Sequence, residues 1–477
     1  MTSSRAKIVK HSLIYGSAEL LNKGLAFLLI PLYSRTFARA EYGILQLLVI
    51  TGTLISIVSQ LGLSSALFRT VMNHDKADHA GIYASATRFL VMISMFAGII
   101  LFLLVPHWGD FLTGGLLSSD VVYCLIGAAL FKNLTIVPTA KLRIEEKPVL
   151  FSLYNSSRYA TQLGLILISV VIFKKGIMGV IWADLIVSIL WGILGLWLLR
   201  NELRATTDKF ILKEMLHFGL PLVPAALALY LLNMADRYLL KVLTSADSLG
   251  LYSMGYRIGM IMMIAVGAFQ QSWAATMFRV ANGDHPEKEF PELYNQFSAF
   301  LLCIGVGISL FSNEILLIFS TSIYYSASTL IPWVAGGYYF LGLYYFTAIG
   351  IHLKKKTQWQ PLIVGIAALL NLGLNFWLIP IWGGHGAAVA TFISFFVMGV
   401  LATLTSQFYY PLPYQWGKNG LLFFIAVILI IVKTYLLHGN TWINFCIKCC
   451  LFSTFAATTI KINHSSIRQL TKLKRLN

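Results

Sequence analysis

Long runs of apolar residues, separated by short polar segments, recur along the chain. A transmembrane helix needs roughly 20 predominantly apolar residues, and windows of about 19 residues identify such runs. The pattern predicts an all-α, polytopic integral membrane protein with about fourteen transmembrane helices. The expected spans are residues 12–34, 42–67, 82–105, 119–140, 150–173, 177–199, 214–240, 249–278, 294–320, 329–350, 360–381, 386–406, 419–438 and 442–461.

The composition agrees with this pattern. Hydrophobic residues make up 57% of the 477 residues and charged residues only 12%, whereas a soluble domain is about 25% charged. A water-soluble enzyme is therefore excluded. The five cysteines lie in apolar stretches, and the histidines show no metal-ligand spacing, so we expect no metal site and no cofactor.

The net charge is +17, from 36 Lys and Arg against 19 Asp and Glu. In a membrane protein such an excess is typical of loops that face the cytoplasm and its anionic headgroups, so we expect no nucleic-acid partner. The largest basic clusters are residues 200–213, Lys354 to Lys356 and the tail from Lys461 to Arg475. They predict that both termini are cytoplasmic, with the first apolar run as a signal anchor.

An internal repeat organises the spans. Gly176-x-x-Gly179-x-x-x-Ala183 recurs at an offset of 207 residues as Gly383-x-x-Gly386-x-x-x-Ala390, and Gly43 matches Gly250 at the same offset. We expect a parallel duplication of six spans, with the substrate site between the two lobes. The predicted domains are residues 1–205, residues 206–406 and residues 407–477, the last comprising two extra spans and a basic tail.

The loops limit the function. No expected loop outside the membrane is long enough for a catalytic domain, and no G-x-x-x-x-G-K-[ST] phosphate-binding loop occurs. We therefore expect a transporter and not an enzyme.

Ionisable residues inside spans are informative because each costs roughly 2.5–3.5 kcal/mol at the bilayer centre on insertion scales. The basic ones outnumber the acidic ones, which suits an anionic substrate. The basic residues are Lys23, Arg88, Lys132, Arg158, Arg237, Arg257, Lys433 and Lys448, and the acidic ones are Glu19, Asp184, Asp236 and Glu314. Lys433 and Lys448 are near span ends, so we expect them to snorkel towards the headgroups.

Arg158 and Arg257 are the strongest anion-binding candidates, because neither has an acidic residue one turn away on its own helix. Lys132 resembles them. Lys23 has Glu19 one turn away, which leaves two interpretations open: a buried neutral pair, or a substrate-binding lysine beside a carboxylate that titrates. Asp184 is a further candidate for gating or ion coupling.

The seventh span begins with Phe218-Gly219-Leu220-Pro221-Leu222-Val223-Pro224. Pro221 and Pro224 each remove a backbone donor, so the helix should bend or break there, as a hinge or as a static kink. Further along the same span, Asp236 and Arg237 are adjacent and oppositely charged. We expect either an ion pair that gates the periplasmic mouth of the transporter or an interfacial pair that caps the helix. The aromatic run from Tyr338 to Tyr345 is compatible with stacking on sugar rings or with packing.

Five segments together resemble the polysaccharide-transport (O-antigen flippase) family of the multidrug/oligosaccharidyl-lipid/polysaccharide (MOP) superfamily. They are Pro31 to Arg35 with Glu41-Tyr42-Gly43, Leu61 to Arg69, Phe218 to Pro224 with Asp236-Arg237, Gly250 to Ser253, and Gly383 to Ala390. The resemblance implies two six-helix lobes around a cationic cavity. It also implies alternating access, driven by a proton or sodium gradient, that moves an undecaprenyl-pyrophosphate-linked oligosaccharide across the bacterial inner membrane. Membrane lipid, a polysaccharide polymerase and chain-length machinery are the implied partners.

Three alternatives stay open at this stage. A multidrug or cation antiporter of the same superfamily would favour an acidic cavity, which the positive balance opposes. A lipid II flippase is a close relative. A membrane polymerase or ligase would need a large periplasmic loop, which the sequence lacks.

Overall fold

A computed structural model describes residues 22, 24–25, 27–437 and 441–473. Across these residues the chain is helical and contains no β-strand. Ten helices are long and apolar enough to cross a membrane, or twelve if each of two bent helix pairs counts as one span. The predicted all-α, polytopic membrane fold is confirmed.

Two of the expected spans are not among these twelve. The first, residues 12–34, lies mostly outside the described residues. The fifth is a continuous helical segment, α7 (Pro148–Leu167) followed by the π-helical turn η1 (Ile168–Ile172). This segment carries the polar residues Asn155, Arg158 and Gln162 and is not among the helices that are long and apolar enough to cross a membrane.

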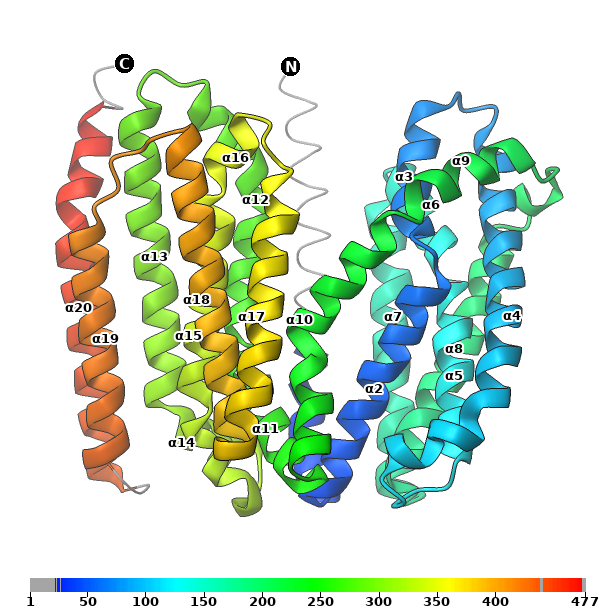
Figure 1. Cartoon of the computed structure of the whole chain (residues 1–477), viewed down its shortest axis with the longest axis horizontal. Helices are drawn as coiled ribbons and strands as arrows, with labels where there is room; N and C mark the ends of the chain where they lie inside the picture. The colour runs from blue at the N-terminus through cyan, green and yellow to red at the C-terminus, as the bar shows by residue number, and fades with distance from the viewer. Residues whose placement is uncertain (1–21, 23, 26, 438–440, 474–477) are drawn as a thin grey trace. The chain divides into compact units, whose positions relative to one another are not determined.

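The chain divides into two compact units, Met1–Met234 and Ala235–Asn477. The division falls within α10, and the boundary expected between residues 205 and 206 stays a prediction. The first unit contains α2 (Arg39–Ser59), α3 (Leu63–Asn73), α4 (His79–Thr113), α5 (Asp120–Asn133), α6 (Ile136–Ile144), α7, η1, α8 (Gly176–Leu198), the short helix η2 (Glu202–Arg204), α9 (Lys209–Gly219) and the start of α10 (Leu222–Leu243). Figure 1 labels most of these elements.

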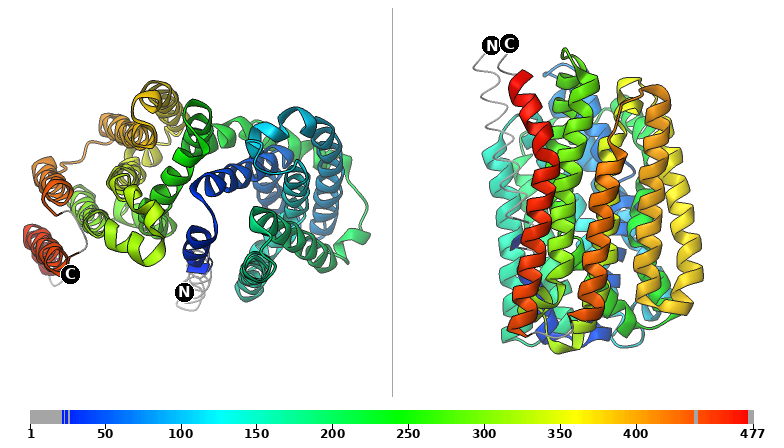
Figure 2. Two further views of the ribbon diagram at one scale, coloured as in Figure 1. Left: turned by 90° about the horizontal axis from the view of Figure 1, so that it is seen from below. Right: turned by 90° about the vertical axis from the view of Figure 1, so that its left-hand side faces the viewer.

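The second unit begins within α10. It continues through α11 (Ala246–Gly259), α12 (Met262–Ala281), α13 (Pro286–Leu310), α14 (Ser312–Phe319), η3 (Ser322–Thr329), α15 (Ile331–Thr347), α16 (Ile349–Leu353), α17 (Trp359–Trp382), α18 (Gly384–Tyr409), α19 (Trp416–Leu436) and α20 (Trp442–Leu473). Figure 2 shows α19 and α20, in orange and red, beside α13 in green.

The two units share one packing order, as the predicted duplication requires. In the first unit α5 packs against both α2 and α8, and in the second α15 packs against both α11 and α18. The repeated glycines Gly176 and Gly383 both have positive φ, at 58° and 54°, beside the starts of α8 and α18. Glycine reaches this backbone region at no steric cost, so the repeated motif marks the same sharp helix start in each unit.

Local chemistry defines other helix starts. The Asp208 carboxylate accepts hydrogen bonds from the backbone N–H groups of Phe210 and Ile211, at 2.7 and 3.3 Å, and caps α9. Ser245 Oγ accepts from the backbone N–H of Ser248 at 3.1 Å and caps α11. Capping satisfies backbone donors that have no partner within the helix.

The helix break expected at the two prolines is present. α9 ends at Gly219, α10 begins at Leu222, and their axes differ by 42°. The break meets another one, between α2 and α3, where Gly62 has a φ of 71°. A Cβ added to Gly62 would lie 2.1 Å from the carbonyl oxygen of Gly219. Two glycines therefore allow two broken helices to cross backbone to backbone.

Candidate functional site

Arg158 lies in the middle of α7 in the first unit. It is ten residues beyond Pro148, the first residue of α7, which corresponds to about 15 Å at 1.5 Å per residue. The side chain is half-buried, and its guanidinium carbon lies 5.1 Å from the ring centroid of Tyr159. Its Nε is buried without a hydrogen-bond partner, and no ion pair to Arg158 occurs among the described residues.

Gln162 and Asp184 extend this polar face. Gln162 is one turn beyond Arg158 on α7, so the two side chains share a face. Its Nε2 donates a hydrogen bond of 2.8 Å to Asp184 Oδ1 on α8. Asp184 is held by an amide and by no cation within the described chain. We call Arg158, Gln162 and Asp184 the α7–α8 polar cluster.

The remaining predicted anion ligands are Lys132, Arg257 and Lys23. Lys132 is half-buried in the last turn of α5, where its ammonium forms no ion pair or hydrogen bond among the described residues. Arg257 is half-buried in the last turn of α11, just before a 47° bend to α12. Lys23 and Glu19 lie outside the described residues. The substrate roles of the three basic residues and the ion-coupling role of Glu19 stay predictions.

Asp236 and Arg237 form a buried ion pair within α10, with an N–O distance of 2.8 Å. They are 2% and 5% exposed. Helix α11 supplies two tyrosines: the Tyr252 hydroxyl donates to the second carboxylate oxygen of Asp236, and the guanidinium carbon of Arg237 lies 4.2 Å from the Tyr256 ring centroid. The cost of removing water from a buried ion pair is offset only when the geometry is good and further hydrogen bonds are formed. The hydroxyl of Tyr252 supplies such a hydrogen bond here.

Tyr338 completes this network. Its hydroxyl lies 2.9 Å from that of Tyr256, which connects α11 to α15. The aromatic run of the tenth expected span therefore contributes to packing around a charge pair at this position. Asp236 and Arg237 were candidate residues from the sequence alone. The three tyrosines around them are 15 to 102 positions away in the chain, and no spacing rule links them to the charge pair.

The snorkelling expected of Lys433 and Lys448 is wrong. Lys433 is 5% exposed and donates to Ser312 Oγ at 2.8 Å, and the fully buried Lys448 pairs with Glu314 at 2.7 Å. The reason is that α13 packs against α19 and α20, and α14 follows α13 directly. Both lysines therefore have polar partners within the second unit.

Two further buried polar groups were not singled out from the sequence. In the first unit, Asn133 accepts from Ser56 Oγ at 2.6 Å and donates to Ser59 Oγ at 2.7 Å. In the second, Asn375 donates to Asn371 Oδ1 at 2.9 Å, while Asn371 Nδ2 and Asn375 Oδ1 have no hydrogen-bond partner in the described chain. The sequence signal that could have identified Asn371 and Asn375 is two asparagines one helical turn apart within an apolar run.

The sequence is similar to a known protein family and to a curated relative. The profile of a family described as “Polysaccharide biosynthesis protein” matches residues 8–280. The “Probable low-salt glycan biosynthesis flippase Agl15” of Haloferax volcanii is 24% identical over 415 residues, which cover 84% of each chain.

Two solved structures share the fold. A lipid II flippase MurJ in an inward closed conformation superimposes with a TM-score of 0.74 at 16% identity, over 94% of this chain and 99% of that one. An inward-facing multidrug resistance transporter of the MATE family and MOP superfamily gives a TM-score of 0.65 at 14% identity, over 83% and 97%. These matches agree with the resemblance inferred from the motifs.

Proposed function

The chain belongs to the polysaccharide biosynthesis protein family, and from this premise we propose that it is a flippase for an undecaprenyl-pyrophosphate-linked oligosaccharide, an O-antigen or related repeat unit. It moves this substrate from the cytoplasmic to the periplasmic leaflet of a bacterial inner membrane by alternating access. Both termini are cytoplasmic. The chain performs no covalent chemistry, and a polymerase receives the translocated unit.

The observation that carries this proposal is the state of Arg158. A guanidinium about 15 Å along α7, the fifth expected span, with no carboxylate partner among the described residues, is costly in a membrane unless a ligand compensates it. A pyrophosphate offers several anionic oxygens, and arginine binds such groups through charge-assisted, often bidentate hydrogen bonds. Lys23, Lys132 and Arg257 are the proposed further ligands.

The test is complementation of a deletion strain. We expect deletion to abolish surface polysaccharide and to leave lipid-linked repeat units on the cytoplasmic face. Arg158→Ala should reduce transport about tenfold or more, because a hydrogen bond to a charged group contributes about 1.5–3 kcal/mol. Arg158→Lys should retain part of the activity, since it keeps the charge and loses the bidentate geometry.

Lys213→Ala is the matched control, because it removes an exposed basic residue of the same unit. Equal activity of the Arg158→Ala and Lys213→Ala proteins at equal abundance would refute the role of Arg158. Drug resistance on expression, with unchanged surface glycan after deletion, would instead support a multidrug antiporter. Loss of lipid II export would support a lipid II flippase.

Ion coupling is proposed at Asp184, with a proton as the simplest ion. When it is charged, the Asp184 carboxylate, which is hydrogen-bonded to Gln162, repels an anion bound at Arg158. A cation bound at Asp184 removes this repulsion. Coupling between two ligands is reciprocal, so cation binding at Asp184 and pyrophosphate binding at Arg158 should favour each other.

Asp184→Asn tests this coupling. The amide keeps an oxygen that accepts from Gln162, so the fold should persist. Transport should lose its dependence on pH or on sodium, measured in vesicles with imposed gradients. A gradient dependence identical to that of the unaltered protein would exclude Asp184 as the coupling residue.

A further inference from the structure

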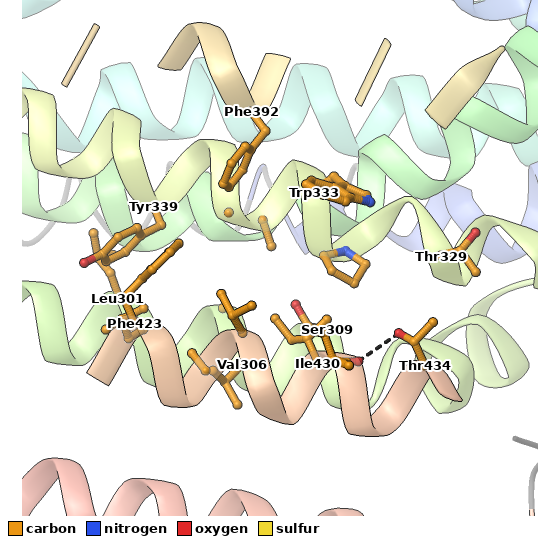
Figure 3. Close-up of a pocket in the computed structure, with 18 of the residues that line it drawn as sticks. Leu301, Val306, Ser309, Thr329, Trp333, Tyr339, Phe392, Phe423, Ile430 and Thr434 are labelled. Atoms are coloured by element: carbon orange, nitrogen blue, oxygen red, sulfur yellow. Dashed lines mark hydrogen bonds between the residues drawn. The ribbon is translucent and has the colours of Figure 1, made fainter. Parts of the chain in front are cut away.

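An apolar cavity of about 540 Å³ lies between α13, α15, α18 and α19 in the second unit. Leu301 and Val306 of α13, Phe392 of α18 and Ile430 of α19 form its walls (Figure 3). At the end of the cavity away from Tyr339, Thr329 is hydrogen-bonded to His385 at 2.8 Å and Thr434 lies opposite. We call this cavity the first chain site.

A second cavity, of about 480 Å³, follows the same helices in the other direction. Leu343 of α15 and Val400 and Leu404 of α18 form its apolar walls. Its far end is polar, with Gln407 and Asn419. We call this cavity the second chain site.

One aromatic stack separates the two chain sites. Tyr339 of α15 and Phe423 of α19 line both cavities, and their rings stack with centroids 5.8 Å apart. Figure 3 shows this pair at the end of the first chain site opposite Thr329 and Thr434. The two sites therefore form one furrow that is interrupted near its middle.

The furrow has the length and polarity of a bilayer. From His385 to Gln407, α18 rises about 33 Å at 1.5 Å per residue, and the hydrocarbon core of a membrane is about 30 Å thick. Both ends are polar and the walls between them are apolar. Beyond the Gln407 end, Lys354 and Lys356 lie 5.7 Å from the ring centroids of Tyr410 and Tyr409, as expected at the headgroups of a cytoplasmic leaflet.

The rims of the furrow are exposed on both sides. Val400 and Leu404 on α18, and Phe424 and Ile431 on α19, are between 39% and 63% exposed. In a membrane the medium that reaches such rims is hydrocarbon, and an apolar cavity without polar partners does not hold water.

We propose that the furrow binds two acyl chains of bilayer phospholipids, one from each leaflet, whose ends meet at the Tyr339–Phe423 stack. The chains fill the space between α18 and α19 and so complete the packing of α19 in the second unit. A single long isoprenoid chain fits less well, because it has a polar group at one end only and would have to pass the stack.

Depth-resolved photolabelling of the full chain tests the proposal. The protein is reconstituted in vesicles of phosphatidylethanolamine and phosphatidylglycerol that contain a phospholipid with a diazirine either at the last chain carbon or near the ester. The chain-end probe should label Tyr339, Phe340 and Phe423, and the ester-proximal probe should label residues near Thr434 and Gln407. Labelling equal to that of the exposed Leu369 and Ile381 on α17, without separation by depth, would overturn the proposal.

Competition distinguishes the two sources of hydrocarbon. With an equimolar amount of unlabelled polyprenyl phosphate, labelling of the furrow should stay within about twofold of labelling without it. A twofold change corresponds to a difference of about 0.4 kcal/mol in binding free energy. Loss of labelling at both chain sites would assign the furrow to an isoprenoid and refute phospholipid as its occupant.

Filling variants test each half separately. Gly420 lines the second chain site and has open space around it, so Gly420→Leu should cut labelling of that site several-fold and spare the first. Gly417 is on the same helix, also in open space, and lines neither site, so Gly417→Leu is the control. Unchanged labelling in a folded Gly420→Leu protein contradicts the proposal, and labelling of the unaltered chain decides the matter if this variant does not fold.

Discussion

The buried charges differ residue by residue in whether the protein compensates them. Asp236 and Arg237 neutralise each other beneath tyrosines, and Glu314 neutralises Lys448. Arg158 has no such partner among the described residues and keeps a buried Nε unbonded. Charge that the protein itself neutralises stabilises a fold, whereas charge left over is available to a ligand. This contrast distinguishes a candidate substrate ligand from a structural ion pair.

The Asp236–Arg237 pair predicts an asymmetric pair of variants. Asp236→Asn leaves the guanidinium buried without a counter-charge, which should destabilise the second unit by about 3–5 kcal/mol. The double variant Asp236→Asn with Arg237→Gln removes both charges and should recover much of that loss. Thermal unfolding in detergent measures both. A double variant less stable than the single one would show that the pair itself, and not the orphaned charge, determines the stability.

The sequence identified these charged residues, but beyond the adjacent Asp236 and Arg237 it did not identify their partners. Apolar runs of span length are local, so the helices and the charges inside them could be predicted. Lys433 and Ser312 are more than a hundred residues apart, as are Lys448 and Glu314. Their pairing depends on how α14 follows α13 and on where α19 and α20 pack. The local pattern of apolar and polar residues predicts neither. The same limit applies to Tyr252 and Tyr338 around Arg237.

At the scale of elements, two of the segments that carried the family resemblance meet in space. The segment from Leu61 to Arg69 begins α3, and the segment from Phe218 to Pro224 joins α9 to α10. Gly62 abuts Gly219, and the guanidinium carbon of Arg69 lies 4.3 Å from the Phe218 ring centroid. Motifs that looked independent in the sequence therefore build one crossing of broken helices.

Gly62→Ala tests this crossing. The added Cβ would lie 2.1 Å from a backbone oxygen, so one of the two helices must move. Gly115→Ala is a matched control, because Gly115 has nearly the same φ, 72° against 71°, but nothing within 4 Å of its Cβ position. The control should lose only the strain of a left-handed alanine, about 1–2 kcal/mol. Equal thermal stability of the two variants would argue against a close helix crossing.

The two prolines near this crossing predict a kinetic effect. Replacing Pro221 and Pro224 with alanine restores two backbone donors and lets α9 continue into α10. If the break is a hinge, transport should slow at unchanged or higher thermal stability, because a hinge absorbs backbone rotation during the cycle. If transport by the purified, reconstituted double variant equals that of the unaltered protein, the break is a static kink.

In the molecule as a whole, the two helices that follow the repeat pack within the second unit. The sequence treated them as additions because the repeat ends near residue 406. In the structure α13 packs against both α19 and α20, and the Ser312–Glu314 region receives their two lysines. The two helices beyond the repeat are therefore attached to the second unit through packing on α13 and through two buried lysines.

Glu314→Gln tests that attachment, because it leaves Lys448 buried without a counter-charge. The native Cys303 on α13 and Cys124 on α5 are half-buried reporters of the second and first units. On mild heating, thiol labelling of Cys303 should rise at a lower temperature than in the unaltered protein, while labelling of Cys124 should not change. Adding Lys448→Gln removes the orphaned charge and should restore protection of Cys303. If the single substitution exposes both cysteines together, the two units unfold as one; if it exposes neither, the charge pair does not hold α20 in place.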